Sequence, residues 1–200
     1  ADCKVQSAPV LAKLAMGGTS GREQPKPAKG KHVVKGTPLY PPWPQGMEEA
    51  MFGMGCFWCT ENIFMRLNGV YSTQVGYAGG KTPNPTYEQV CTGSTGHNEV
   101  CRVIFDPNVV PYEQLLKLFW EKHDPTTPNR QGNDRGTQYR SGIYCHTAAQ
   151  AVTAEETKAR FEEALKKKGR AQPICTEIVF PPPTFHYAEE YHQQYDARPG

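Results

Sequence analysis

The stretch "GCFWCTE" at residues 55–61 places two thiols, Cys56 and Cys59, three positions apart. Side chains at positions i and i+3 of a helix are neighbours, and at that separation two cysteines can form a disulfide. The spacing therefore predicts a redox couple, in which one thiol reacts and the other closes a disulfide with it.

The residues around Cys56 predict where this thiol lies. Residues 49–55 have the pattern of a buried strand that ends in glycine, and residues 57–67 repeat apolar side chains at helical spacing. Cys56 would then begin a helix, where free backbone N–H groups and the helix dipole favour a thiolate. We expect its pKa to be lowered from about 8.5 toward about 3.5–7.5.

The residues alone leave other interpretations open. Cys56 and Cys59 could form half of a zinc site if Cys91, His97 or Cys101 supplied the remaining ligands, although the sequence has no second Cys-x-x-Cys. They could be structural thiols in the interior. A Cys-x-x-Cys at a helix start is also typical of general dithiol–disulfide oxidoreductases.

Composition narrows the class of protein. A chain of 200 residues favours one domain with its own core, and a net charge of +2 gives no general reason to expect nucleic acid or a membrane as partner. Seven cysteines, an odd number, and the absence of a glycosylation sequon favour reduced thiols and a cytoplasmic location. Residues 1–46 are basic and rich in proline, which predicts a largely flexible extension or a remnant of organelle targeting. Within it, Tyr40 and Trp43 are expected to lay residues 38–46 on the domain.

The remaining residues, 47–200, show the pattern of one catalytic domain. We expect strands at 49–55, 70–78, 99–105, 142–146 and 174–180, and helices at 57–67, 112–123 and 153–168. Thr153 and Glu156 form the capping box that predicts the start of the last helix. This order favours an α+β, two-layer sandwich on a mixed sheet with split βαβ (ferredoxin-like) units and long loops.

Several separated blocks of sequence resemble one known family. They are "MGCFW" (54–58), "GVYSTQVGYAGG" (69–80), "TPNPTYEQVC" (82–91), "TGHNEV" (95–100), "FWEKHDP" (119–125), "RQGNDRGTQYRS" (130–141) and "YAEEYHQQY" (187–195). Together they make the chain from about Met47 to Tyr195 similar to the peptide methionine sulfoxide reductases of the A type. The resemblance implies a monomeric enzyme without a cofactor that reduces the S epimer of methionine sulfoxide in peptides and proteins, and also the free amino acid.

The resemblance also implies roles for individual residues. A methyl sulfoxide has a small apolar end and a strongly accepting oxygen. Phe57 and Trp58 would form the pocket for the methyl group. Glu99 would give a proton to the oxygen, because a carboxyl group in an apolar site stays protonated. Further donors and an additional carboxylate are implied at Tyr87, Tyr139 and Asp134.

The implied cycle leaves Cys56 as a sulfenic acid, which a second cysteine converts to a disulfide that thioredoxin reduces. Many relatives carry this second cysteine in a glycine-rich tail and have glycine at position 59, whereas the present sequence has Cys59 and no such tail cysteine. We expect Cys59 to be the resolving cysteine, with Cys101 and Cys91 as weaker candidates.

Three histidines near the motifs are expected to be structural. His97 should anchor its loop, and His186 and His192 should pack near the end of the domain, although the block "YHQQY" (191–195) could line the site.

Overall fold

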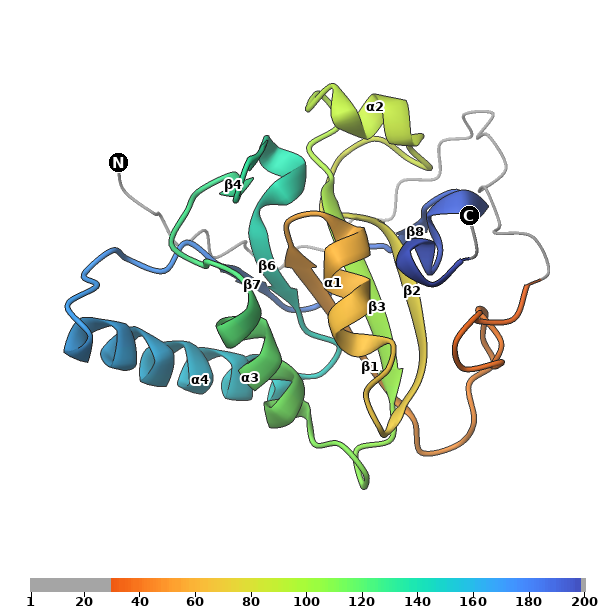
Figure 1. The fold of residues 1–200 in the computed structure, drawn as a ribbon, viewed down its shortest axis with the longest axis horizontal. Coiled ribbons are helices and arrows are strands. Elements are labelled where there is room, and N and C mark those ends of the chain that lie inside the picture. Colours follow the sequence, from red (N-terminus) through yellow and green to blue (C-terminus); the bar gives the residue numbers. More distant parts are fainter. Residues whose placement is uncertain (1–29, 199–200) are drawn as a thin grey trace.

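The computed structural model describes residues 30–198 (Figure 1). Of the predicted flexible extension at residues 1–46, residues 1–29 lie outside this described part. The first elements of the domain are β1 (Glu48–Met54), α1 (Phe57–Phe64), β2 (Val70–Ala78) and β3 (Asn98–Phe105). The later ones are α3 (Tyr112–Lys122), β6 (Ser141–Tyr144), α4 (Ala148–Lys167), β7 (Glu177–Val179) and β8 (His186–Tyr187).

The centre of the sheet consists of two interleaved βαβ units. In the first unit α1 connects β1 to β2, and β3 lies between these strands and is antiparallel to both. In the second unit α3 connects β3 to β6, with β1 between them. The full strand order is β7-β6-β1-β3-β2-β8, in which β6 and β7 are a parallel pair. The predicted α+β fold with split βαβ units on a mixed sheet is therefore confirmed.

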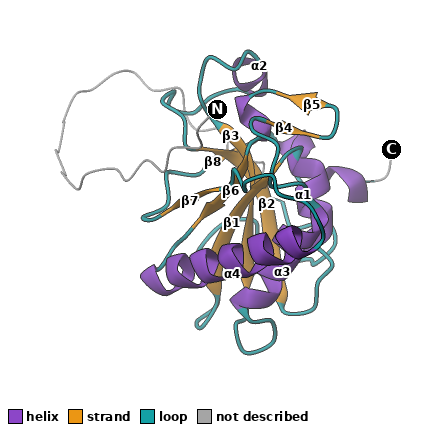
Figure 2. Ribbon diagram, turned by 90° about the vertical axis from the view of Figure 1, so that its left-hand side faces the viewer, coloured by secondary structure: helices purple, strands orange, loops and turns teal. Residues whose placement is uncertain are grey.

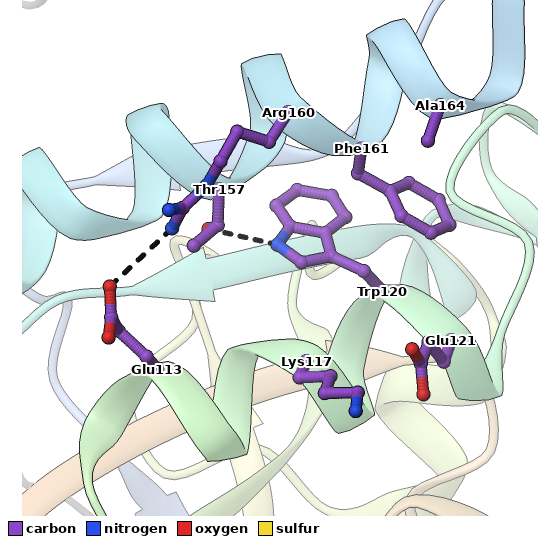
Figure 3. Close-up of a pocket in the computed structure, with 8 residues that line it drawn as sticks. All are labelled: Glu113, Lys117, Trp120, Glu121, Thr157, Arg160, Phe161 and Ala164. Atoms are coloured by element: carbon purple, nitrogen blue, oxygen red, sulfur yellow. Dashed lines mark hydrogen bonds and ion pairs between the residues drawn. The ribbon is translucent and has the colours of Figure 1, made fainter. Parts of the chain in front are cut away.

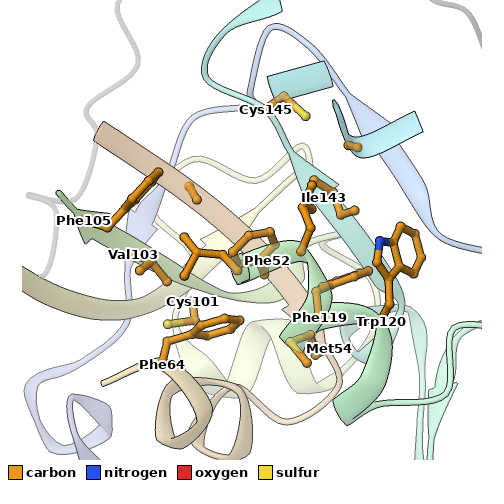
Figure 4. Close-up of a cluster of buried hydrophobic side chains, with 14 of the residues drawn as sticks. Phe52, Met54, Phe64, Cys101, Val103, Phe105, Phe119, Trp120, Ile143 and Cys145 are labelled. Atoms are coloured by element: carbon orange, nitrogen blue, oxygen red, sulfur yellow. The ribbon is translucent and has the colours of Figure 1, made fainter. Parts of the chain in front are cut away.

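The helices α1, α3 and α4 share one hydrophobic core with the strands that they cover. Figure 4 shows this cluster, in which Phe52 of β1 stacks against Phe64 of α1 and packs against Phe119 of α3. Cys101 of β3 is fully buried among the same side chains. Burying this many apolar side chains is the main stabilising contribution to the fold.

The other face of the sheet is covered by irregular segments. Residues 38–46 cross it, with Leu39 buried, the ring of Tyr40 packed 5.0 Å from that of Tyr187, and Trp43 donating a hydrogen bond to Glu49 at 2.8 Å. The guanidinium of Arg102 lies over the rings of Trp43 and Tyr187. The arm at residues 38–46 thus lies on the domain through Tyr40 and Trp43, as predicted.

Several element boundaries differ from the predictions. Helix α4 begins at Ala148 rather than at residue 153, because Thr147 caps it by accepting the N–H of Gln150. Thr153 is inside the helix, and its hydroxyl donates to the carbonyl of Ala149. Helix α1 ends at Phe64, and β7 is a short strand that stops before the prolines at 181–183.

The long loops contain short elements that were not predicted. They are α2 (Tyr87–Cys91), β4 (Arg130–Gln131), β5 (Asp134–Arg135) and the 3-10 turn η1 (Thr137–Tyr139). Both views place α2 and the β4–β5 hairpin at the same end of the sheet (Figures 1 and 2). The capping box formed by Thr86 and Gln89 was a sequence signal for α2.

A cavity of about 310 Å³ lies between α3 and α4, away from the predicted site residues (Figure 3). Trp120 donates a hydrogen bond to Thr157 at 3.0 Å and stacks on Phe161, and Arg160 pairs with Glu113 at 3.5 Å. The cavity is therefore the space left between the packed side chains of α3 and α4. Within residues 30–198, no helix has the length and apolar character needed to cross a membrane.

Candidate active site

Cys56 occupies the N-cap position of α1, directly after β1. Gly55 makes this junction possible: its φ is +92°, and a Cβ there would lie 2.6 Å from the Cβ of Gln131. The Cys56 thiol is half-buried, and the nearby backbone N–H groups of Trp58 and Cys59 act to lower its pKa. The helix start thus presents donors to the sulfur, as predicted.

The expected lowering of the Cys56 pKa is wrong for the substrate-free site. Burial raises the pKa of Cys56 to about 12, and it outweighs the N–H groups of Cys59 and Trp58, which lower it. Neighbouring Cys59 and Glu99 add repulsion that raises it further. In this state Cys56 is a thiol, and a thiolate has to form together with substrate binding.

Glu99 lies at the start of α1, beside Cys56, although it is 42 positions from Phe57 in the sequence. Its Oε2 accepts the backbone N–H of Phe57 at 3.1 Å, and its side chain is almost fully buried on β3. Burial raises the pKa of Glu99 to about 8, with a further contribution from the charge of Asp134, while the Phe57 N–H opposes them. The carboxyl group therefore carries a proton at neutral pH.

Tyr87 and Tyr139 approach the same carboxyl from two different segments, α2 and η1. Both rings are half-buried. Burial is the largest cause that raises the pKa of each hydroxyl, and the charge of Glu99 raises both further. The pKa of Tyr139 rises to about 12. Both therefore remain hydrogen-bond donors. Asp134 is exposed on β5 and acts on Glu99 and Tyr139 through its charge.

The two aromatic residues after Cys56 have different surroundings. Phe57 is buried in a cluster with Val75, Tyr77, Val90 and Ala188. Trp58 is half-buried, and its ring stacks on that of Tyr195 with a centroid separation of 4.0 Å. Phe57 thus belongs to the interior, whereas Trp58 forms part of the accessible wall of the site.

A terminal segment at residues 189–195 forms the other wall, which sequence reasoning assigned mainly to packing. Glu189 accepts hydrogen bonds from the Tyr77 hydroxyl and the Tyr87 N–H, both at 2.9 Å. The buried Glu61 of α1 holds Gln194 by accepting its backbone N–H at 2.7 Å and its side-chain amide at 2.8 Å. The block "YHQQY" was the sequence signal for this wall.

The remaining predicted residues lie around or below the site. Cys59 and Cys91 are exposed, and the Tyr87 hydroxyl lies near the Cys91 sulfur. Cys101 lies within the hydrophobic core. His97 anchors its loop, as predicted, through the Gly80 N–H and the Thr82 carbonyl.

The zinc alternative lacks a suitable set of ligands. Among the described residues, no three His, Cys, Asp or Glu side chains form a group that could hold a metal ion. The structure therefore groups Cys56 with Glu99, Tyr87 and Tyr139, sets Asp134 at the rim and separates Cys101 from them.

Comparison with known proteins agrees with this arrangement. The family model described as "Peptide methionine sulfoxide reductase" matches residues 48–199, which is most of the chain. The chain belongs to this family. Within the peptide methionine sulfoxide reductase family it is 58% identical over 178 residues to "Peptide methionine sulfoxide reductase MsrA 1" of Synechocystis sp., a match that covers 89% of the chain and 79% of the relative.

Solved structures of the family have the same fold. Methionine sulfoxide reductase A of Corynebacterium diphtheriae is 40% identical, with a TM-score of 0.79 over 88% of this chain and 84% of that one. The reduced form of Mxr1 from Saccharomyces cerevisiae is 36% identical, with a TM-score of 0.67 over 76% of this chain and 86% of that one. The yeast protein has also been solved in complex with Trx2.

Proposed function

We propose that this chain is an oxidoreductase that reduces methionine S-sulfoxide in peptides and proteins, and the free amino acid, with Cys56 as the nucleophile. The observation that carries the proposal is the buried Glu99 carboxyl, protonated at neutral pH and hydrogen-bonded to the residue that follows Cys56. A thiol next to a neutral acid fits a substrate whose oxygen must gain a proton. Preference for the S epimer follows from the family resemblance.

Substrate binding uses two kinds of surface. Trp58 receives the methyl group and the buried Phe57 packs behind it, because an aromatic wall offers apolar contact without competing hydrogen bonds. The sulfoxide oxygen points toward Glu99, Tyr87 and Tyr139, whose O–H groups are the available donors. These donors stabilise the charge that grows on the oxygen as the bond to sulfur breaks.

The first chemical step transfers oxygen between two sulfur atoms. Glu99 gives its proton to the sulfoxide oxygen while the Cys56 sulfur attacks the methionine sulfur, and the proton of the Cys56 thiol restores Glu99. The S–O bond of the substrate then breaks as the OH group moves to the Cys56 sulfur. The S–S bond made by the attack breaks and leaves its electron pair on methionine, so Cys56 ends as a sulfenic acid. Methionine sulfur gains the two electrons that Cys56 loses, so the step balances without a cofactor. The negative charge of Asp134 favours the protonated form of Glu99 that begins this step.

The second step forms a disulfide. The Cys59 thiol attacks the Cys56 sulfenic acid, an S–S bond forms and water leaves. Two observations support Cys59 as the resolving cysteine: it is exposed, and its backbone N–H lies near enough to the Cys56 sulfur to lower the pKa of Cys56. Cys101 would have to leave the core to react, and Cys91 lies at the end of the separate helix α2.

We propose a monomer whose disulfide is reduced by a thioredoxin. The exposed position of Cys59 gives an external dithiol access to the bond. Support also comes from Mxr1, a relative that has been solved with Trx2.

A single turnover tests the proposal. Reduced protein is mixed with excess methionine S-sulfoxide and no reductant, methionine is counted, and the cysteines are mapped by mass spectrometry. One methionine per chain with a Cys56–Cys59 disulfide supports both steps. One methionine with Cys56 left as sulfenic acid supports the first step and rules out Cys59 as resolver.

The same assay addresses the dithiol–disulfide alternative. Folded protein that reduces insulin disulfides but forms no methionine would overturn the proposal. The R epimer serves as the control substrate, since it presents its oxygen and methyl group exchanged in the site.

A further inference from the structure

His192 lies at the centre of the aromatic wall but has no role in the proposed chemistry. It ends the 3-10 turn Glu190–His192, and only 1% of its surface is exposed. Its ring centroid is 5.1 Å from that of Phe57, 5.6 Å from that of Trp58 and 4.5 Å from that of Tyr87. The imidazole therefore touches both the methyl pocket and one of the oxygen donors while remaining out of reach of the substrate.

One hydrogen bond fixes the chemical state of this ring. The indole N–H of Trp58 donates to Nδ1 of His192 at 3.1 Å. An indole nitrogen can only donate, so Nδ1 must keep its lone pair and the ring proton must be on Nε2. Nε2 is buried, has no hydrogen-bond partner among residues 30–198 and lies 3.8 Å from Oε2 of Glu189. Burial lowers the pKa of His192, against the charges of Glu189 and Glu88, and so favours this neutral form.

The residues that hold His192 are themselves fixed. Glu189 accepts the Tyr77 hydroxyl and the Tyr87 N–H. Gln193 pairs with both backbone groups of Val75, its Oε1 accepting the N–H at 2.9 Å and its Nε2 donating to the carbonyl at 2.8 Å. The position of His192 is thus determined by β2 and α2, and not by the indole that it contacts.

We propose that His192 is a positioning residue that fixes the edge of the Trp58 indole, while Tyr195 supports its face, and thereby sets the affinity for the methyl sulfoxide group. The inference rests on the proposed function, because it assigns the wall of the same site. An indole without this bond could turn about its side-chain torsions, and the pocket would lose its shape before substrate binds.

Two variants separate the hydrogen bond from the bulk of the ring. His192→Phe keeps a ring and removes the acceptor, whereas His192→Asn places an amide oxygen near the position of Nδ1. With dithiothreitol as reductant and a peptide containing methionine S-sulfoxide, His192→Phe should raise KM about threefold to tenfold, the range expected for losing one neutral hydrogen bond. Its kcat should stay within about twofold of the wild type, since no group that reacts is removed. His192→Asn should restore most of the affinity.

A spectroscopic measurement reports the bond directly. The chain has three tryptophans, so the indole N–H signals can be assigned by NMR with Trp58→Phe. In His192→Phe the Trp58 signal alone should shift and exchange faster with water. The matched control is His146→Phe, which replaces a half-buried histidine that lies near Glu49, away from Cys56, and should leave KM and the Trp58 signal unchanged.

Acidification of the wild type provides a test that needs no variant. Protonation of Nδ1 must displace the indole N–H, so the Trp58 signal should move and KM should rise together as pH falls through the lowered pKa of His192. The titratable groups around the ring are Glu88 and Tyr87 on one side and Glu189 and Tyr191 on the other. His192→Asn should lack this coupled change.

The outcomes separate this inference from the proposed function. A wild type that forms no methionine overturns both. An active wild type whose KM and indole signal are the same in His192→Phe overturns the positioning role alone. A loss of kcat with unchanged KM also overturns it, because it would place His192 in the chemistry.

Discussion

Cys56 lies at the N-terminal start of α1, and Cys101 lies on β3 in the core that α1 covers. Burial raises the pKa of both thiols. Cys56 is half-buried, with two N–H donors and a protonated carboxyl beside it. Cys101 is two residues beyond Glu99 on β3 and is enclosed by apolar side chains of the core (Figure 4).

The difference shows that the surroundings of a thiol decide its role. Neither thiol is ionised in the substrate-free state, so a lowered pKa does not distinguish them. Cys56 lies beside an acid that can exchange a proton with a substrate and has an open side that can admit one, whereas Cys101 is fully buried and has no open side.

The largest effect should come from removing the nucleophile. Cys56→Ser should lower methionine formation on the order of 10⁴-fold or more, the scale of loss when a nucleophile is removed. The measurement is methionine per chain in the single turnover. Cys101→Ala is the matched control and should yield the wild-type amount; substantial methionine from Cys56→Ser would reverse the roles of the two thiols.

The next effect concerns the acid beside Cys56. Glu99→Gln keeps the shape and removes the proton donor, so kcat/KM should fall about 10²- to 10⁴-fold. In the wild type the active form is the protonated one, and activity should therefore decline as pH rises through about 8, the raised pKa of Glu99. That decline should be absent from the residual activity of the variant. An unchanged pH profile would mean that another group gives the proton.

A smaller effect is expected from removing Cys59, which should stop disulfide formation without stopping reduction of the substrate. Cys59→Ser should form one methionine per chain at the wild-type rate but leave Cys56 without a disulfide, because the resolving thiol is missing. Turnover with thioredoxin should drop by more than an order of magnitude. If mass spectrometry instead finds Cys56 joined to Cys91 or Cys101 at full rate, Cys59 is not the resolver.

The smallest effect should come from replacing Cys101 in the core, which should change the stability of the protein and not its activity. Cys101→Ala removes one buried sulfur from a packed cluster, which should lower the free energy of unfolding by about 1 kcal/mol. Urea denaturation measures this change. Single-turnover activity should be unaffected, and a clear loss of activity in a folded Cys101→Ala protein would contradict its assignment to the core.

Local patterns in the sequence were sufficient for the fold and for half of the site. Strand and helix periodicities predicted the order of the main elements, and the glycine before Cys56 predicted its place at a helix start. Boundaries failed where a side chain decided them: Thr147 caps α4 before the capping box at Thr153 is reached.

The rest depended on residues far apart in the chain. The bond between Trp58 and His192 spans 134 positions, and no periodic pattern specifies such a contact. The raised pKa of Cys56 has the same origin, because the helix start is visible in the sequence but the segments that bury the thiol are not.

The wall formed by residues 189–195 has a consequence for the order in which the protein becomes competent during synthesis. Domains emerge from the ribosome with their N-terminal part first. A nascent chain exposed only to residue 180 already contains Cys56, Glu99 and Tyr139 but lacks the segment that holds the Trp58 indole in place. Because a domain folds as a unit, the site stays incomplete until residues 189–195 have left the ribosome, and thiol chemistry and substrate affinity begin together after that point.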